Sequence, residues 1–181
     1  MKRIMKAIAC LLALTMCMLA FCACGETEEA PVTKLTKTSR QISDAVRAGA
    51  DFSGATFVAS DEMDADLVLM FNYAIDTDEM INAIEDYVLS TQTNNQYPAF
   101  FSVIRVKEGT DPAIISAIAE AVKGGYVQYN IDQMVLYNAD GLAVAQGYTV
   151  KTYDNGIIIT AYNESGNTEI IELAEACCRA E

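Results

Sequence analysis

The stretch GYTVKTYDNGIIITAY, residues 147–162, decides which fold the sequence predicts. Two runs rich in β-branched and aromatic residues flank Asp154-Asn155-Gly156. Asn-Gly is the preferred pair of a two-residue type I′ turn because both residues tolerate positive φ. The stretch therefore predicts a β-hairpin whose core face carries Val150, Ile157, Ile159 and Ala161.

The second face of this hairpin is predicted to meet solvent or a partner, and it is more apolar than solvation alone requires. Aromatic residues are enriched at the cores of protein interfaces. The sequence therefore predicts a partner-binding surface made of Lys151, Tyr153, Ile158, Thr160 and Tyr162. Two alternatives remain: Tyr153 and Tyr162 pair across the strands only to stabilise the sheet, or a further layer covers them.

The segment before the hairpin predicts a strand and a helix. Residues 99–107, AFFSVIRVK, form a β-branched and aromatic run that is typical of a strand. Asp111 and Pro112 then have the chemistry of a helix start, and apolar residues recur with helical spacing from Ile114 to Val122. Gly124-Gly125 is predicted to end this helix, and a tyrosine-containing loop is predicted to follow.

Three further helices complete the predicted domain. One covers residues 39–48, and one begins at Asp76 or Thr77, although its later part, residues 87–91, equally fits a strand. The last helix is capped by Ser165 or Asn167. The order of elements predicts one α+β domain over residues 39–181, an antiparallel sheet of hairpins with helices on one face.

The first 24 residues, MKRIMKAIACLLALTMCMLAFCAC, have the pattern of an export signal. A basic head precedes an uncharged run from Ala7 to Cys24. The end of this run resembles a bacterial lipobox, in which a small residue precedes a cysteine that is lipidated and becomes the new N-terminus. Cys24 fits that position, although Phe21 stands where leucine is usual. The alternative is an uncleaved transmembrane helix, because 18 apolar residues are just enough to span a bilayer.

The charge of the chain limits its partners. Without residues 1–23, nine basic and 25 acidic residues remain, which gives a net charge of about −16. Nucleic acid is an unexpected partner for so acidic a chain. The charge also repels anionic lipid, so we expect attachment through the anchor, with diacylglycerol and palmitate chains on Cys24. Residues 24–38 are polar and lack periodicity, which predicts a flexible tether.

The residue types that remain narrow the possible chemistry. The chain has no histidine, which excludes Ser-His-Asp and Cys-His catalysis and His-ligated metals. The acidic run from Asp61 to Asp66 lacks the glycine that a calcium-binding EF-hand loop requires. Cys177 and Cys178 either form a strained vicinal disulfide or redox pair, or both pack along the last helix. We therefore predict no metal, no cofactor and no catalytic residues.

Several features between Leu69 and Ile159 resemble those of a family of small lipoproteins of Gram-positive bacteria that carry one uncharacterised domain. These features are the run ending in Asn72-Tyr73-Ala74-Ile75-Asp76, Tyr87-Val88, residues 101–107, residues 114–122, Tyr129 and residues 147–150. A glycine is usual before Ile-Asp in that family, and this chain has Ala74 there. The resemblance implies a lipoprotein outside the cytoplasm and supplies no catalytic residues.

The sequence favours a non-catalytic binding or interaction module held on the outer side of the cell membrane. Its expected contacts are the membrane, through the lipid anchor, and a protein partner in the cell envelope. The alternative is a small hydrolase that acts on the envelope with a pair of carboxylates. The sequence leaves open whether the chain is an enzyme and leans toward a non-enzymatic role.

Overall fold

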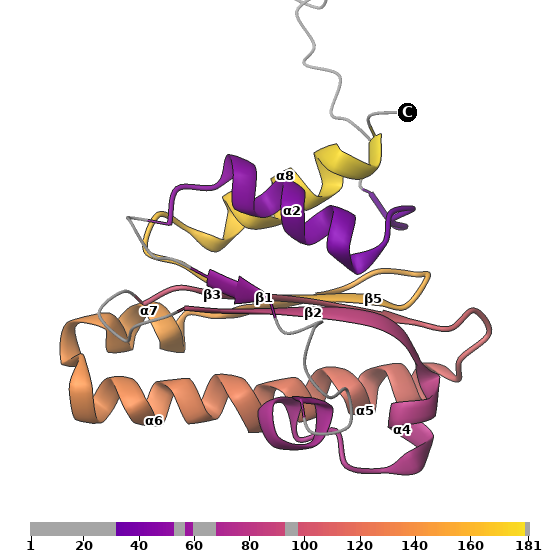
Figure 1. Cartoon of the computed structure of the whole chain (residues 1–181), viewed down its shortest axis with the longest axis horizontal. Helices are drawn as coiled ribbons and strands as arrows, with labels where there is room; N and C mark the ends of the chain where they lie inside the picture. The colour runs from indigo at the N-terminus through magenta and orange to yellow at the C-terminus, as the bar shows by residue number, and fades with distance from the viewer. Residues whose placement is uncertain (1–31, 53–56, 60–67, 93–97, 180–181) are drawn as a thin grey trace, which may run out of the picture. The chain divides into compact units, whose positions relative to one another are not determined.

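A five-stranded antiparallel sheet lies at the centre of the fold (Figure 1). This computed structural model describes residues 32–52, 57–59, 68–92 and 98–179. They belong to one compact unit, Val32–Glu181. The strand order is β1 (Phe57–Ala59), β2 (Ile84–Gln92), β3 (Phe100–Val106), β5 (Ile157–Tyr162) and β4 (Thr149–Thr152).

Helices cover both faces of the sheet. On one face lie α2 (Ser39–Gly49) and α8 (Asn167–Arg179). On the other lie α4 (Asp78–Ala83), α5 (Pro112–Val122), α6 (Gln128–Tyr137) and α7 (Leu142–Gln146), with the short helical segments η1 (Val68–Asn72), η2 (Lys123–Val127) and η3 (Ala139–Gly141). The predicted α+β class with an antiparallel sheet is confirmed, and helices lie on two faces where the prediction had one.

Strand β3 shows why two helical layers form. Its residues are buried almost without interruption. Alternate side chains of a strand point to opposite faces of the sheet, so both faces must be covered to bury them all. Phe101 and Val103 pack in the core beneath α2 and α8, whereas Phe100 and Ile104 pack in the core against α5 and α6. A continuous apolar run such as this is typical of a strand covered on both sides.

The hairpin turn differs from the prediction by one residue. Tyr153 pairs with Ile157, the Gly156 N–H donates to the Tyr153 carbonyl, and Gly156 has φ +77°. Asn155 is not among the non-glycine residues with positive φ, so the type I′ geometry is absent from this described turn. The loop contains three residues and carries glycine at its left-handed position. Therefore Thr149 faces Ala161 and Val150 faces Thr160.

The helix that begins at Pro112 does not end at Gly124-Gly125, so this prediction is wrong. The side chain of Asp111 caps its first turn by accepting a hydrogen bond from Ala113 N–H, as predicted. The chain then continues through the π-helical η2 directly into α6, where the prediction had a loop. The amide of Asn130 donates to the Tyr126 carbonyl at 2.7 Å, which satisfies a backbone acceptor at this irregular turn.

Helix α2 begins as its sequence predicts. Thr38 and Gln41 form a capping box, in which each side chain bonds the other residue's backbone N–H. Thr77 caps α4 through Met80 N–H, and β2 begins at Ile84, directly after α4 ends. The strand alternative for residues 87–91 is therefore confirmed.

The compact unit begins seven residues before the predicted start of the domain. Leu35 is 1% exposed and packs in the core beneath α2 and α8. Residues 32–38, which the prediction assigned to the tether, are therefore part of the packed structure. The export signal, Cys24, residues 24–31 and the acidic run 61–66 lie outside the described residues. Within the described ranges, no helix has the length and apolarity that crossing a bilayer requires.

Candidate functional site

The five residues of the predicted partner surface do not share one face. Ile158, Thr160 and Tyr162 are each 0% exposed and lie on the face that α5 and α6 cover. Lys151 pairs with Ile159, so its side chain and that of Tyr153 point to the face that α8 covers. The one-residue change of register is the cause, because it moves every side chain of β4 to the other face. The predicted surface is therefore not formed.

Lys151 and Tyr153 instead hold α8 on the sheet through Glu175. Glu175 Oε1 accepts hydrogen bonds from Lys151 Nζ at 2.5 Å and from the Tyr153 hydroxyl at 2.8 Å. The Lys151 ammonium also lies 5.1 Å from the centre of the Tyr153 ring. Arg179 Nη2 lies 3.7 Å from Glu175 Oε2. Tyr153 and Tyr162 therefore lie on opposite faces and do not pair across the strands. The alternative in which a further layer covers them is the one that the structure shows.

The ionisation of this cluster suits a structural role. Burial acts to raise the pKa of Glu175, but hydrogen bonds from Lys151 and Tyr153 outweigh it and hold that pKa below its ordinary value. Burial, and then the bond to Glu175, raise the pKa of Tyr153. Glu175 is therefore an anion at neutral pH, and Tyr153 is a neutral donor to it.

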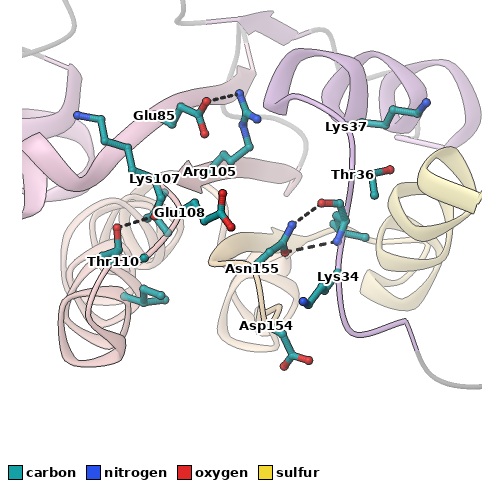
Figure 2. A pocket seen from close by; sticks show the side chains of 14 residues that line it. Lys34, Thr36, Lys37, Glu85, Arg105, Lys107, Glu108, Thr110, Asp154 and Asn155 are labelled. Carbon is teal, nitrogen blue, oxygen red and sulfur yellow. Dashed lines mark hydrogen bonds and ion pairs between the residues drawn. The ribbon is translucent and has the colours of Figure 1, made fainter.

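An open cleft of about 850 Å³ lies at the tip of the hairpin (Figure 2). Its walls are formed mainly by residues 34–37, the end of β3 with the turn after it, and the hairpin turn, and β2 and α5 each add one residue. The lining residues are Lys34, Leu35, Thr36, Lys37, Glu85, Arg105, Val106, Lys107, Glu108, Gly109, Thr110, Ile115, Asp154 and Asn155. This volume lies within the range of small-molecule sites.

The side chain of Asn155 builds one wall of the cleft. Its amide donates to the Leu35 carbonyl, and its Oδ1 accepts from Leu35 N–H (Figure 2). The Asp154 N–H also donates to the Thr33 carbonyl at 2.7 Å. These bonds satisfy backbone groups of residues 33–35 and fix this segment beside the hairpin turn.

The opposite wall is the turn that joins β3 to α5. Thr110 bonds the Lys107 carbonyl through its hydroxyl at 2.7 Å and through its N–H at 3.2 Å. Gly109 has φ +81°, a conformation that favours glycine. The Lys107 N–H donates to Ala83 O at 2.8 Å, which ties the turn to the end of α4. Both walls are therefore held by backbone hydrogen bonds.

The cleft concentrates the cations of an acidic chain. The described residues include nine basic side chains, and four of them line this cleft: Lys34, Lys37, Arg105 and Lys107. The lining acids are Glu85, Glu108 and Asp154. The cleft lining therefore has a formal charge of +1 in a chain whose net charge is −13. A lining that is so much less negative than the rest of the chain repels an anionic ligand less.

Arg105 links the cleft to the scaffold. Its Nε donates to Asp86 Oδ2 at 2.8 Å, and its Nη2 lies 3.2 Å from Glu85 Oε1. Asp86 also accepts from Ser39 N–H at 3.0 Å. Burial acts to raise the pKa of Asp86, but the bonds from Arg105 and Ser39 outweigh it and lower that pKa. The same pairing raises the pKa of Arg105.

Metal and thiol chemistry find no support in the described part of the chain. No group of three or more His, Cys, Asp or Glu side chains is placed there to hold a metal ion. Cys177 and Cys178 are free thiols on α8, and Cys177 Sγ lies 3.8 Å from the Gln41 carbonyl that accepts from it. Burial raises the pKa of Cys177, which keeps it in the thiol form at neutral pH.

Comparisons of this chain with protein-family models, with curated proteins and with solved structures gave no match. The resemblance to a lipoprotein family therefore stays a prediction. Sequence reasoning also missed the cleft, because its residues form no motif. The one available signal was Asn155, whose side chain has both a donor and an acceptor beside a turn.

Proposed function

We propose that the chain is a lipid-anchored module on the outer side of the cell membrane that binds a ligand or protein partner in the cleft and does no chemistry on it. The observation that carries this proposal is the cleft itself. It is about 850 Å³ in volume and is lined by four of the nine basic residues of the described chain. Its walls are fixed in advance, which lowers the entropy lost on binding.

The state of the carboxylates supports binding over hydrolysis. A glycosidase-type mechanism needs one carboxylic acid that keeps its proton near neutral pH. The pKa values of Asp86 and Glu175 are instead lowered by cationic partners, so both are anions at neutral pH. Each of them joins secondary-structure elements and faces a basic side chain. These two carboxylates are therefore suited to hold the scaffold together.

The anchor is tested by changing the proposed lipidated residue. The export signal and the Ala23-Cys24-Gly25 junction predict a lipid on Cys24. Cys24→Ala should release the protein from membranes or leave the signal uncleaved, whereas Cys22→Ala should change neither property. The readouts are membrane fractionation and the intact mass of the mature chain. An unmodified mature N-terminus at another residue would contradict lipidation.

The cleft is tested by charge reversal with a matched control. Lys34→Glu changes the charge of the cleft wall, and Lys123→Glu makes the same change at the end of α5, outside the cleft. A photoreactive residue at Thr36 should cross-link the bound component in membranes of the source cell. Lys34→Glu should reduce that cross-link at least tenfold, and Lys123→Glu should leave it within twofold. Equal cross-linking in both variants would refute binding in the cleft.

A further inference from the structure

Four hydroxyl groups are buried on the sheet face that α5 and α6 cover. They belong to Tyr73, Ser102, Thr160 and Tyr162, and each of these residues is 0% exposed. None of the four hydroxyl oxygens makes a hydrogen bond to another described residue. Buried hydroxyls are nearly always hydrogen-bonded, so four exceptions in one domain require an explanation. They lie in the interior and are separate from the cleft.

The four hydroxyls belong to one patch of the core. Ser102 on β3 lies directly opposite Thr160 on β5. Tyr162 follows Thr160 by two residues, and alternate residues of a strand share a face. Tyr73 follows η1, and burial raises its pKa. The Ser102 hydroxyl lies near enough to offset part of that rise, although no hydrogen bond joins the two.

Aromatic rings surround this patch and keep it uncharged. The ring centre of Phe100 lies 4.9 Å from that of Tyr126 and 5.5 Å from that of Tyr162. Tyr73 meets Tyr87 edge to face at 6.0 Å. Burial raises the pKa of Tyr73, Tyr126 and Tyr162, so their phenols remain neutral. A molecule held here would meet neutral hydroxyls that both donate and accept hydrogen bonds.

The backbone beside the patch is irregular at two neighbouring places. The π-helical η1 and η2 contact each other, and π-helical turns are frequent at functional sites. Ala74, next to Tyr73, has φ +55°, a left-handed conformation that is unfavourable for alanine. Strained backbone of this kind also concentrates at binding sites. Ala74 is the left-handed residue that ends this helical segment, where Ile75 N–H donates to the Leu69 carbonyl, so its φ and η1 are one feature. The irregular backbone and the buried hydroxyls therefore meet at Tyr73.

We propose that the hydroxyls of Tyr73, Ser102, Thr160 and Tyr162 form an internal binding site for a small uncharged molecule that both donates and accepts hydrogen bonds, either water or a small alcohol. Phenylalanine or valine would fill the same space without any buried hydroxyl. A bound molecule with two to four polar partners is the usual way in which such groups are satisfied. The ligand is uncharged because no ionised group belongs to the set.

The test removes single hydroxyls while it keeps side-chain volume. Tyr162→Phe and Thr160→Val delete one hydroxyl each, and Tyr137→Phe is the control because Tyr137 is 71% exposed. If the hydroxyls hold a bound molecule, both core variants should unfold at a lower urea concentration than the wild type. Tyr137→Phe should leave the midpoint unchanged. If the hydroxyls are unpartnered, both core variants should unfold at a higher concentration, because a buried polar group has been removed.

Two measurements on the wild-type protein identify the molecule. Magnetic relaxation dispersion of the water signal detects long-lived internal water, and this signal should be lost in Thr160→Val. Native mass spectrometry detects a small alcohol as an added mass, which should disappear after refolding from urea in plain buffer. A raised or unchanged urea midpoint in both core variants, or a wild-type protein with neither a long-lived water signal nor an added mass, would overturn the proposal.

Discussion

Gly124 and Gly125 are neighbours in η2, and alanine at each should change stability in opposite directions. A Cβ atom at Gly125 would lie 2.7 Å from the Ala74 Cβ and 2.8 Å from the carbonyl carbon and oxygen of Tyr73. Two of these atoms belong to the backbone, which cannot rotate away as a side chain can. A Cβ at Gly124 would have no heavy atom within 4 Å outside its own helical segment.

The magnitudes follow from two opposing effects. Replacing glycine by alanine inside a helix stabilises it by about 1 kcal/mol. Overpacking a rigid contact costs about 1–3 kcal/mol. Gly124→Ala should therefore raise the free energy of unfolding by up to about 1 kcal/mol. Gly125→Ala should lower it by up to about 2 kcal/mol, so the two variants should differ by roughly 1–3 kcal/mol.

Urea unfolding followed by circular dichroism measures this difference directly. Thermal unfolding measures the same difference in another way. The two melting temperatures should differ by about 2–4 °C for each kcal/mol in a chain of this size. Because both variants carry the same chemical change one residue apart, the unfolded state affects them equally. If Gly125→Ala were as stable as Gly124→Ala, the close approach of η2 to Tyr73 would be refuted.

Three further changes test other parts of the fold. Ala74→Gly should stabilise the protein by about 0.5–1 kcal/mol in thermal unfolding, because glycine adopts the φ of +55° without strain; a loss of stability would contradict the left-handed backbone. Gly156→Val should lower stability by about 2–4 kcal/mol, since φ is +77° and its Cβ would lie 2.1 Å from Val106 Cγ2; an unchanged melting temperature would exclude this turn. Glu175→Gln should cost about 1–2 kcal/mol at pH 7. The pKa of Glu175 is lowered from 4.5 in the folded protein, so its carboxylate stabilises the fold fully above pH 4.5. That stabilisation is lost as the pH falls through the folded pKa. Plots of unfolding free energy against pH for the mutant and the wild type should therefore converge in acid.

Local sequence chemistry predicted where helices begin, because those signals act within a few residues. Asp111 with Pro112 forms the expected cap of α5, and Thr77, one of the two predicted candidates, caps α4. The stop at Gly124-Gly125 failed for a tertiary reason. Glycine has a low helix propensity, but packing of η2 against Tyr73 requires a residue without Cβ at position 125. Glycine there marks a close approach between two segments.

The hairpin shows how a small local difference removes a predicted site. Asn155-Gly156 correctly marked the turn, but the sequence does not distinguish a two-residue loop from a three-residue loop. That single residue decides whether Tyr153 lies on the face of Ile158 or on the face of Ile159. The cleft was unpredictable for a different reason, since its walls come mainly from three distant segments and residues 34–37 have no periodicity.

The bonds between Asn155 and Leu35 determine how tension would enter this domain. A pull on the chain from the N-terminal side reaches the described structure first at Val32. It must then break the bond from Asp154 N–H to the Thr33 carbonyl and the two Asn155 bonds, and extract the buried Leu35, before it unwinds α2. Leu35 also lines the cleft, so the cleft wall is the first part of the domain that a mechanical load deforms. Ligand binding in the cleft would therefore be coupled to force on the N-terminal segment. A ligand that contacts residues 34–37 would raise the force that detaches them. In return, a sufficient force would release the ligand.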